Sequence, residues 1–513
     1  MSSSTDPTST LFTDVHVYDA ELAAGMTAPT DLLIEGNRVS AIGRDATHNA
    51  GRSARVIEGR SHHLLIPGLV NAHFHSPANH LKGSLPSLPL ELFMLYESPA
   101  DVALTPTPRE AYLRTLLAAI EMLRTGATAV QDDAFLMPFP TPEITDSVMQ
   151  AYADCGIRAS VALDQAELTE ADKLPYLAAT DDPEMRAALQ RPSPMSRRDL
   201  LENYDHLIST WHGSYDGRLT AAVSISAPQR VSVEYFEALD DLSRRHRIPI
   251  FAHMLETKVQ RVLATEQPRF NGRSLVEYTD DLGLLSDRMN VIHAVWVDDA
   301  DLELIAGAGA VIAHNPISNL RLGSGVAPFR RMKDFGITTA LGTDEAICDD
   351  SVNLWGVVKM TGLIHNVSGL DSDLWPTPAE VLDSLWRGGA AALLRSDDLG
   401  ALRPGYLADL VLLDLDTMAF TPFNDLRGQL VYCESGASVR LTMVNGRVVY
   451  EQGHVVGIDE PALLAEAREV FMQKRPAIER ARLAADRLRP GYQEMVRRAA
   501  AAEVGMTRWV GQR

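Results

Sequence analysis

Two kinds of hydrophobic pattern divide the chain into two ends and a middle. At both ends, short runs rich in β-branched residues are broken by Gly, Asn and Asp, a pattern typical of strands joined by hairpins. These runs lie within residues 1–66 and again within residues 399–458. The simplest account is one small β-sandwich domain built from both ends of the chain.

The middle of the chain, residues 67–398, alternates short apolar runs with helical patterns. Near-continuous apolar runs are typical of parallel strands that helices cover. Eight such runs over this length predict the α/β fold class and a (β/α)8 barrel of the TIM type, with a doubly wound open sheet as the alternative. The predicted strands are residues 64–75, 127–133, 157–164, 219–227, 248–253, 289–294, 309–315 and 337–344.

Two further segments fall outside this scheme. Residues 165–200 are polar and contain several prolines, and we expect them to cross the barrel mouth as a lid or to be disordered. Residues 459–513 are charged and helical in pattern. We expect this C-terminal extension to form a helix pair that packs against the body of the protein or against a partner subunit.

The charge balance restricts the partners. The 513 residues include 47 Lys+Arg and 68 Asp+Glu, which gives a formal net charge of -21. Nucleic acids and anionic membranes attract positive charge, so we expect neither as a partner and expect a small-molecule substrate instead. The three cysteines, Cys155, Cys348 and Cys433, are far apart, which disfavours a disulfide framework. The first residues are polar and do not resemble a secretory signal, and no apolar run is long enough to span a membrane. We therefore expect a cytoplasmic protein.

Histidines and an aspartate stand where several predicted strands end. His73 and His75 end the first strand two residues apart, so their side chains point to the same side. His253 ends the fifth strand, His293 the sixth and Asp344 the eighth. The strand ends of a barrel meet at one face, where the active sites of this fold lie. A His-x-His pair alone is more often structural, but the convergence of four strand ends favours a metal site.

These residue types suit a single divalent cation. Three neutral imidazoles and one carboxylate suit Zn²⁺, with Fe²⁺ or Mn²⁺ as alternatives. We predict that the ligands are His73, His75, His253 and Asp344. The fourth strand region, residues 219–230, contains no lysine that could bridge two ions as a carbamate, so we expect one ion.

Three residues have predicted catalytic roles. Glu256 comes three residues after His253 and is placed to take a proton from the attacking water and pass it on. His293 could bind the metal, but it fits better as the donor to the oxygen or ring nitrogen that gains charge in the transition state. Asp344 could also accept a hydrogen bond from the attacking water.

Several ordered motifs resemble one enzyme family. They include IPGLVNAHFHSPANHLKG at 66–83, HMLET at 253–257, IHAVWV at 292–297 and LGTDEA at 341–346. Over about residues 10–460 the chain is similar to the mononuclear branch of the amidohydrolase superfamily, which includes S-adenosylhomocysteine and adenosine-type deaminases and triazine chlorohydrolases. The resemblance implies a metal-binding barrel with a β-sandwich, commonly in homodimers or larger assemblies. Carried over by motif, it implies the same four ligands, Glu256 as the proton shuttle and His293 as the polarising histidine.

Positions near the substrate differ from the purine-type members of that branch. Those members usually have a histidine after the fourth strand, often another after the sixth, and a glycine after the eighth-strand aspartate. Here these positions hold Ser226, Trp296 and Glu345. Trp296 is predicted to form an aromatic wall of the substrate site or simply to pack in the interior. Glu345 or Asp349 is predicted to meet an amine or guanidine, and purine nucleosides should be poor substrates.

The predicted function is that of a metal-dependent hydrolase acting on a non-peptide carbon–nitrogen bond. The favoured reaction is deamination, or removal of an amine or halide, on a small cyclic or aromatic compound. The first alternative is hydrolysis of an acyclic urea, carbamate or amide by the same site. A more distant alternative is a scaffold that lost catalysis, which is disfavoured because all four predicted ligands, Glu256 and His293 are present.

Overall fold

The computed structural model describes residues 9–98, 102–138, 140–177 and 182–511. Its centre consists of parallel strands in two sheets, one of four strands and one of five. Each of the eight predicted strands is present, the fourth in two pieces. In chain order they are β6 (Leu69–Phe74), β7 (Ala127–Ala134), β8 (Arg158–Leu163), β9 (Leu219–Ala221), β10 (Val223–Ser224), β11 (Ile250–Met254), β12 (Met289–His293), β13 (Val311–His314) and β14 (Thr339–Leu341).

Backbone hydrogen bonds join the edges of the two sheets. A single residue, Ala222, separates β9 from β10, and its N–H donates to the carbonyl oxygen of Val161 in β8 at 2.8 Å. The next residue, Val223, donates to the carbonyl oxygen of Pro249 at 2.9 Å, beside the other sheet. At the far edges, the N–H of Asp344 donates to the carbonyl oxygen of His73 at 3.0 Å. The chain is therefore an α/β protein whose parallel strands end at one common face.

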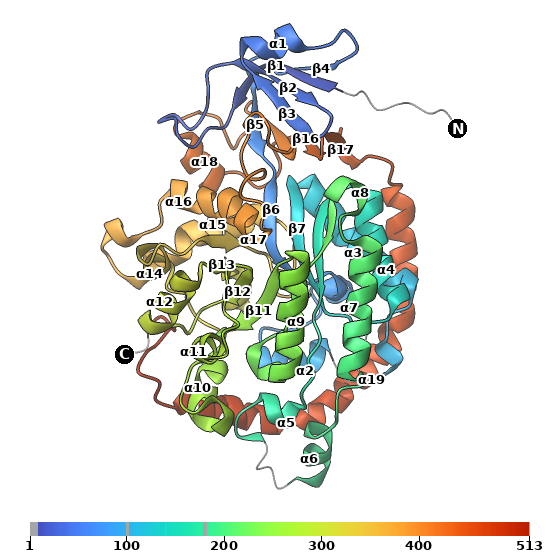
Figure 1. Cartoon of the computed structure of the whole chain (residues 1–513), viewed down its shortest axis with the longest axis vertical. Helices are drawn as coiled ribbons and strands as arrows, with labels where there is room; N and C mark the ends of the chain where they lie inside the picture. Colours follow the sequence, from blue (N-terminus) through green and yellow to red (C-terminus); the bar gives the residue numbers. More distant parts are fainter. Residues whose placement is uncertain (1–8, 99–101, 139, 178–181, 512–513) are drawn as a thin grey trace.

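Amphipathic helices cover the outer side of these strands (Figure 1). Every residue of β7 and β8 is buried, as expected for strands enclosed on both sides. α3 begins with a capping box between Thr107 and Glu110, which satisfies N–H groups of its first turn. The helices of this segment include α3 (Pro108–Arg124), α4 (Pro142–Cys155), α7 (Arg197–Trp211), α9 (Val233–His246), α10 (Lys258–Glu266), α11 (Leu275–Asp281), α12 (Asp299–Ala308), α15 (Leu354–Ile364) and α16 (Pro378–Asp383).

Strands from both chain ends share one sheet of nine strands, at one end of the molecule (Figure 1). Its order is β18-β17-β16-β15-β5-β1-β2-β3, and β4 pairs with β1. The two ends meet where β5 and β15 pair antiparallel, with Leu65 opposite Leu412. The strands are β1 (Ser9–Val17), β2 (Thr30–Glu35), β3 (Arg38–Ile42), β4 (Arg55–Glu58), β5 (His63–Pro67), β15 (Leu410–Asp414), β16 (Val439–Val444), β17 (Arg447–Glu451) and β18 (His454–Val455).

The C-terminal extension is one helix of 42 residues, α19 (Glu460–Ala501). The prediction of a helix pair is therefore wrong. Pro476 and Pro490 lie inside α19, and each removes a backbone hydrogen bond, which favours a break when the helix is considered alone. Tertiary packing outweighs this preference, because α19 contacts both α10 and α2 (Leu90–Glu97). Its buried stripe includes Ala477, Ala481 and Ala485, at the four-residue spacing of one helix face.

The described part of residues 165–200 is packed against α19. It contains α5 (Glu170–Lys173) and α6 (Pro183–Leu189), whereas residues 178–181 lie outside the described residues. Leu177 and Met185 are buried in one apolar cluster with Tyr492 of α19. Whether this segment acts as a lid stays a prediction.

Two expectations concern features away from the site. Within the described ranges, no helix is both long enough and apolar enough to cross a membrane. All three cysteines are free: Cys155 and Cys348 are buried, and Cys433 is exposed.

Candidate metal centre

Four histidines and an aspartate meet at the carboxyl ends of the parallel strands. The ring centroid of His73 lies 4.6 Å from that of His75 and 4.9 Å from that of His253. The rings of His75 and His253 are stacked at 5.4 Å, and His293 lies 5.6 Å from His253. All of these side chains and Asp344 are buried. The predicted convergence of strand ends is present.

Hydrogen bonds aim the histidine rings. Nδ1 of His75 lies 2.5 Å from the carbonyl oxygen of Asp133, and Nδ1 of His253 lies 2.7 Å from that of Ser226. A carbonyl oxygen only accepts, so the proton sits on Nδ1 and the lone pair on Nε2, as metal-binding histidines require. Nε2 of His73 is buried and has no hydrogen-bond partner among the described residues.

Asp344 completes this group. Its Oδ1 lies 3.4 Å from Nε2 of His73 and 3.6 Å from Nε2 of His75. Its Oδ2 accepts a hydrogen bond from Ser318 Oγ at 2.6 Å. Potential ligand atoms of His73, His75 and His253 lie within 4.8 Å of one another, and Asp344 shares such groups with His73 and with His75. An unpartnered buried imidazole nitrogen and a set of three imidazoles with one carboxylate fit a divalent metal.

Glu256 and His293 face the same group. Nε2 of His293 lies 3.6 Å from Glu256 Oε2 and 3.6 Å from Asp344 Oδ2. Two amides flank the other ring nitrogen of His293: Asn319 Oδ1 lies at 2.9 Å and Asn315 Nδ2 at 3.4 Å. These amides orient the ring so that Nε2 points to the carboxylates.

Burial sets the protonation states of the site. It lowers the pKa of His73 to about 3 and, together with the neighbouring histidines His73 and His75, holds the pKa of His253 well below its ordinary value. Burial opposes ionisation of Asp344, but its contacts with His73 and His293 hold its pKa well below the usual range. Burial and the Asp344 carboxylate raise the pKa of Glu256 well above its ordinary value. His73, His253 and Asp344 are therefore in their metal-binding forms near neutral pH, and Glu256 is suited to exchange a proton.

Backbone conformations at the strand ends are unusual. Five non-glycine residues there have positive φ angles, a region that side chains disfavour. Such conformations persist where the surrounding structure enforces them, and they cluster at functional sites. The residues are Ser226 (59°), Leu255 (52°), His293 (74°), Ala294 (48°) and Asp344 (60°).

Comparisons with known proteins agree with this geometry. Residues 64–449 match the model of the Amidohydrolase family. The chain belongs to the amidohydrolase family. A 5-methylthioadenosine/S-adenosylhomocysteine deaminase of Nitratidesulfovibrio vulgaris is 34% identical over 441 residues, covering 86% of this chain and 91% of that protein. A 5'-deoxyadenosine deaminase of Methanosarcina barkeri is 29% identical over 439 residues, covering 85% of this chain and 92% of that protein.

Solved structures share the fold of this amidohydrolase. An adenosine deaminase from Xanthomonas campestris with bound zinc has a TM-score of 0.77 and 25% identity, covering 91% of this chain and 98% of that one. An atrazine chlorohydrolase from Arthrobacter aurescens, complexed with zinc, has a TM-score of 0.76 and 24% identity, covering 90% and 99%. The predicted resemblance is confirmed, and the protein is a metal-dependent hydrolase acting on carbon–nitrogen bonds.

The two predicted substrate residues lie in different surroundings. Glu345 is at the site: its ligand atom lies within 4.8 Å of those of His75 and Asp344. Burial and the Glu97 carboxyl raise the pKa of Glu345 well above its ordinary value. Trp296 is fully buried, donates from Nε1 to the carbonyl oxygen of Ser324 at 2.8 Å, and packs against the Trp509 ring. Substrate contact by either residue stays a prediction.

Further polar residues at the site were missed by reasoning from the sequence. Asp133 and Asp164 are buried, each has an Oδ1 without a partner among the described residues, and potential ligand atoms of both group with His75. They are the last residues of the second and third predicted strands, so the rule that identified His253 could have found them. Glu97, at the end of α2, interacts with Glu345, and no sequence pattern marks it.

Proposed function

We propose that this amidohydrolase deaminates a compact amino-substituted heterocycle, with one Zn²⁺ held by His73, His75, His253 and Asp344. One observation carries the proposal: Nε2 of His293 lies 3.6 Å from both Glu256 and Asp344, beside the ligand group. A bound divalent metal supplies Lewis acidity and lowers the pKa of water toward about 7. Zinc in both solved relatives supports this choice of metal.

Glu256 carries the proton in this proposal. It is buried, and its pKa is raised by burial and by Asp344, so it accepts a proton from the attacking water more readily than an exposed glutamate. The same carboxyl then donates that proton to the leaving amine. Its distance of 3.6 Å from His293 keeps both groups beside the same reacting atoms.

His293 stabilises the ring nitrogen or oxygen that gains charge. It donates from Nε2 in the tautomer whose Nδ1 accepts a hydrogen bond, and Asn315 Nδ2 lies at 3.4 Å from Nδ1 as a donor. This tautomer requires the Asn319 amide to be turned, because its Oδ1, at 2.9 Å from Nδ1, can only accept. Turning the Asn319 amide, whose Nδ2 is buried without a partner among the described residues, supplies a second donor to Nδ1. Asp344 is placed to accept a hydrogen bond from the attacking water, because its Oδ2 lies 3.6 Å from Nε2 of His293.

The substrate class follows from the residues around this machinery. Deaminases among the relatives support removal of an amino group. Ser226, Trp296 and Glu345 replace two histidines and a glycine expected in purine-type members, so hydrogen-bonding partners of a nucleoside are missing. A site that lacks such partners discriminates poorly for that substrate. A compact heterocycle with amino groups is the better fit to a site rich in carboxyl groups.

The finer architecture is part of this proposal. The strand interrupted at Ala222 and the hydrogen bond from Asp344 to His73 support closure of the parallel sheets into a (β/α)8 barrel over residues 67–398. Pairing of β1 shifts register between Phe12 and Val15, and buried residues from both chain ends form one apolar cluster. These features support a β-sandwich of residues 1–66 and 399–458, with 459–513 as a helical extension.

The test is a survey of products from purified, zinc-loaded enzyme. Amino-pyrimidines, amino-triazines, adenosine, 5'-deoxyadenosine and aryl ureas would be incubated with enzyme and with the Glu256→Gln variant as a blank. Ammonia release from a heterocycle supports the proposal. An amine with carbon dioxide from a urea would instead identify the acyclic alternative.

A further inference from the structure

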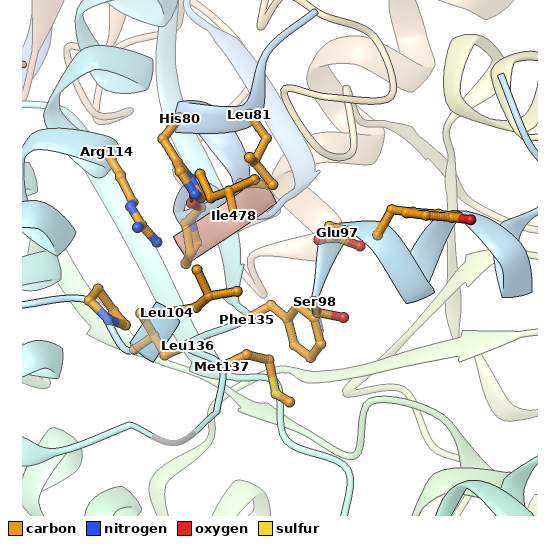
Figure 2. A pocket seen from close by; sticks show the side chains of 14 residues that line it. His80, Leu81, Glu97, Ser98, Leu104, Arg114, Phe135, Leu136, Met137 and Ile478 are labelled. Carbon is orange, nitrogen blue, oxygen red and sulfur yellow. Dashed lines mark hydrogen bonds between the residues drawn. The ribbon is translucent and has the colours of Figure 1, made fainter. Parts of the chain in front are cut away.

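A cavity of about 50 Å³ lies where α2 and the segments after β6 and β7 meet α19. Its walls are mostly apolar and include Pro77, Leu81, Leu136 and Ile478. Figure 2 shows two charged residues on opposite sides of this cavity, Arg114 of α3 and Glu97 of α2.

Arg114 is a buried cation that has no hydrogen bond or ion pair from its side chain within the described residues. It is 5% exposed, and among the described residues its guanidinium forms no hydrogen bond or ion pair. The carboxylate nearest in sequence, Glu110, is already engaged: it accepts from the N–H of Thr107 at 2.6 Å and lies 3.3 Å from Lys474 Nζ. Buried charges are normally paired, because an unpaired one loses its hydration without compensation. Such a group in a cavity wall points to a ligand that supplies the missing charge.

The other side of the cavity is close to the metal centre through Glu97 and Glu345. The Glu97 carboxyl interacts with that of Glu345, and the ligand atom of Glu345 lies within 4.8 Å of those of His75 and Asp344. The cavity therefore has a guanidinium in one wall and, in the opposite wall, the Glu97 carboxyl, which is linked to the metal centre through Glu345.

We propose that Arg114 binds a carboxylate carried by the substrate, whose hydrolysable end lies at the metal centre. This inference rests on the proposed function and narrows the substrate to an amino-substituted ring bearing an anionic arm. A guanidinium pairs with a carboxylate through two parallel hydrogen bonds, which gives both strength and orientation. The apolar walls accommodate the arm that joins the two ends.

The binding test uses the zinc-loaded full chain and acetate as the probe. At constant ionic strength, sodium acetate in place of sodium chloride should raise the Tm of the wild type in a saturable manner. Arg114→Met should remove this response. Arg109→Met is the matched control, because Arg109 lies on the same helix but pairs with Glu466 outside the cavity, and it should keep the response. Equal responses of wild type and Arg114→Met, or none in the wild type, would overturn the site.

The stability of the variants separates a binding role from a structural one. In chloride, Arg114→Met should have a Tm equal to or above that of the wild type, because a buried unpaired cation is removed. Arg114→Lys keeps the charge without the paired geometry and should retain a weaker acetate response. Loss of folding in Arg114→Met together with an unchanged acetate response in Arg114→Lys would assign Arg114 a structural role and overturn the proposal.

The substrate test compares an amino-pyrimidine with the same compound bearing a carboxymethyl group. The wild type should prefer the carboxylated compound by roughly 10–100-fold in kcat/KM, the range expected for hydrogen bonds to a charged group. Arg114→Met should lose that preference. An acetate response without any such preference would make the anion a separate effector and overturn its assignment to the substrate. If no compound is hydrolysed, the proposed function fails, while the acetate titration still decides the site.

Discussion

Ser318 donates a hydrogen bond from Oγ to Oδ2 of Asp344 at 2.6 Å. This contact ties the first turn of α13 (Pro316–Arg321) to the segment that follows β14. It occupies one carboxylate oxygen and leaves Oδ1 facing His73 and His75. The orientation of the proposed ligand is therefore set by a residue outside the ligand set.

Ser318→Ala should weaken metal binding without unfolding the protein. Loss of a hydrogen bond that orients a ligand typically lowers metal affinity about 10–100-fold. Competition with a chromophoric chelator measures the affinity directly. Ser147→Ala, on the surface of α4, is the control, and an affinity of Ser318→Ala equal to that of this control would contradict the assigned role.

The metal content should be one ion per chain. Potential ligand atoms of His73, His75 and His253 lie within 4.8 Å of one another, which suits one ion, and the fourth-strand region has no lysine to bridge a second. Elemental analysis of active protein should give about one equivalent of zinc, iron or manganese. Chelation should abolish activity, and one equivalent of metal should restore it. A requirement for two equivalents would disprove the single-ion site.

Glu256→Gln should retain the metal and lose most of its activity. Replacement removes the group that accepts and returns the proton, so kcat should fall by roughly 10²–10⁴. Metal analysis and steady-state kinetics on the same preparation test both parts. Glu303→Gln changes an exposed glutamate on α12 and should leave kcat unchanged. A near-normal kcat of metal-loaded Glu256→Gln would show that a residue other than Glu256 carries the proton.

Purine nucleosides should be poor substrates compared with compact amino-heterocycles. Ser226 and Trp296 stand where purine-type members have histidines, and unpaired buried polar groups cost about 1–3 kcal/mol each. Values of kcat/KM across nucleosides, nucleotides, triazines and amino-pyrimidines test this order. A nucleoside that exceeds the others by orders of magnitude would show that the three replaced positions do not control specificity.

Asp349→Asn should stabilise the protein increasingly as the pH rises. Burial, with smaller contributions from Glu121 and Asp350, raises the pKa of Asp349 to about 7. The folded state thus keeps a proton that the unfolded state has already lost above pH 4, and wild-type stability falls as pH rises from about 4 to 7. The variant cannot ionise, so its advantage should reach roughly 1–3 kcal/mol at pH 8.

Denaturant unfolding of both proteins at pH 5 and pH 8 measures this difference. Asp205→Asn, which changes an exposed aspartate on α7, should show no comparable gain. A stability difference between Asp349→Asn and wild type that does not change with pH would show that Asp349 ionises equally in both states.

The sequence by itself determined which residues form the strands and which of them end at the site. His73, His253 and Asp344 each stand at the end of an apolar run. Parallel strands bring their carboxyl ends to one face of the fold, and this placement does not depend on the conformations of the loops. Hydrophobic patterns with a period of two or 3.6 residues depend only on neighbouring positions in the chain, so they predict strands and helices before the fold is known. The same logic extended to Asp133 and Asp164, where it was not applied.

Only the tertiary structure decided the contacts between segments far apart in the chain. The helix α19 is continuous despite its two prolines because tertiary packing stabilises it. The local sequence pattern does not reveal this packing, so it could not predict the continuous helix. The mutual placement of α2, α3 and the strand ends brings Glu97 to Glu345 and buries Arg114, whose side chain forms no hydrogen bond with any described residue. Burial and charge proximity are properties of the assembled chain, so the shifted pKa values and the cavity exist only once it has folded.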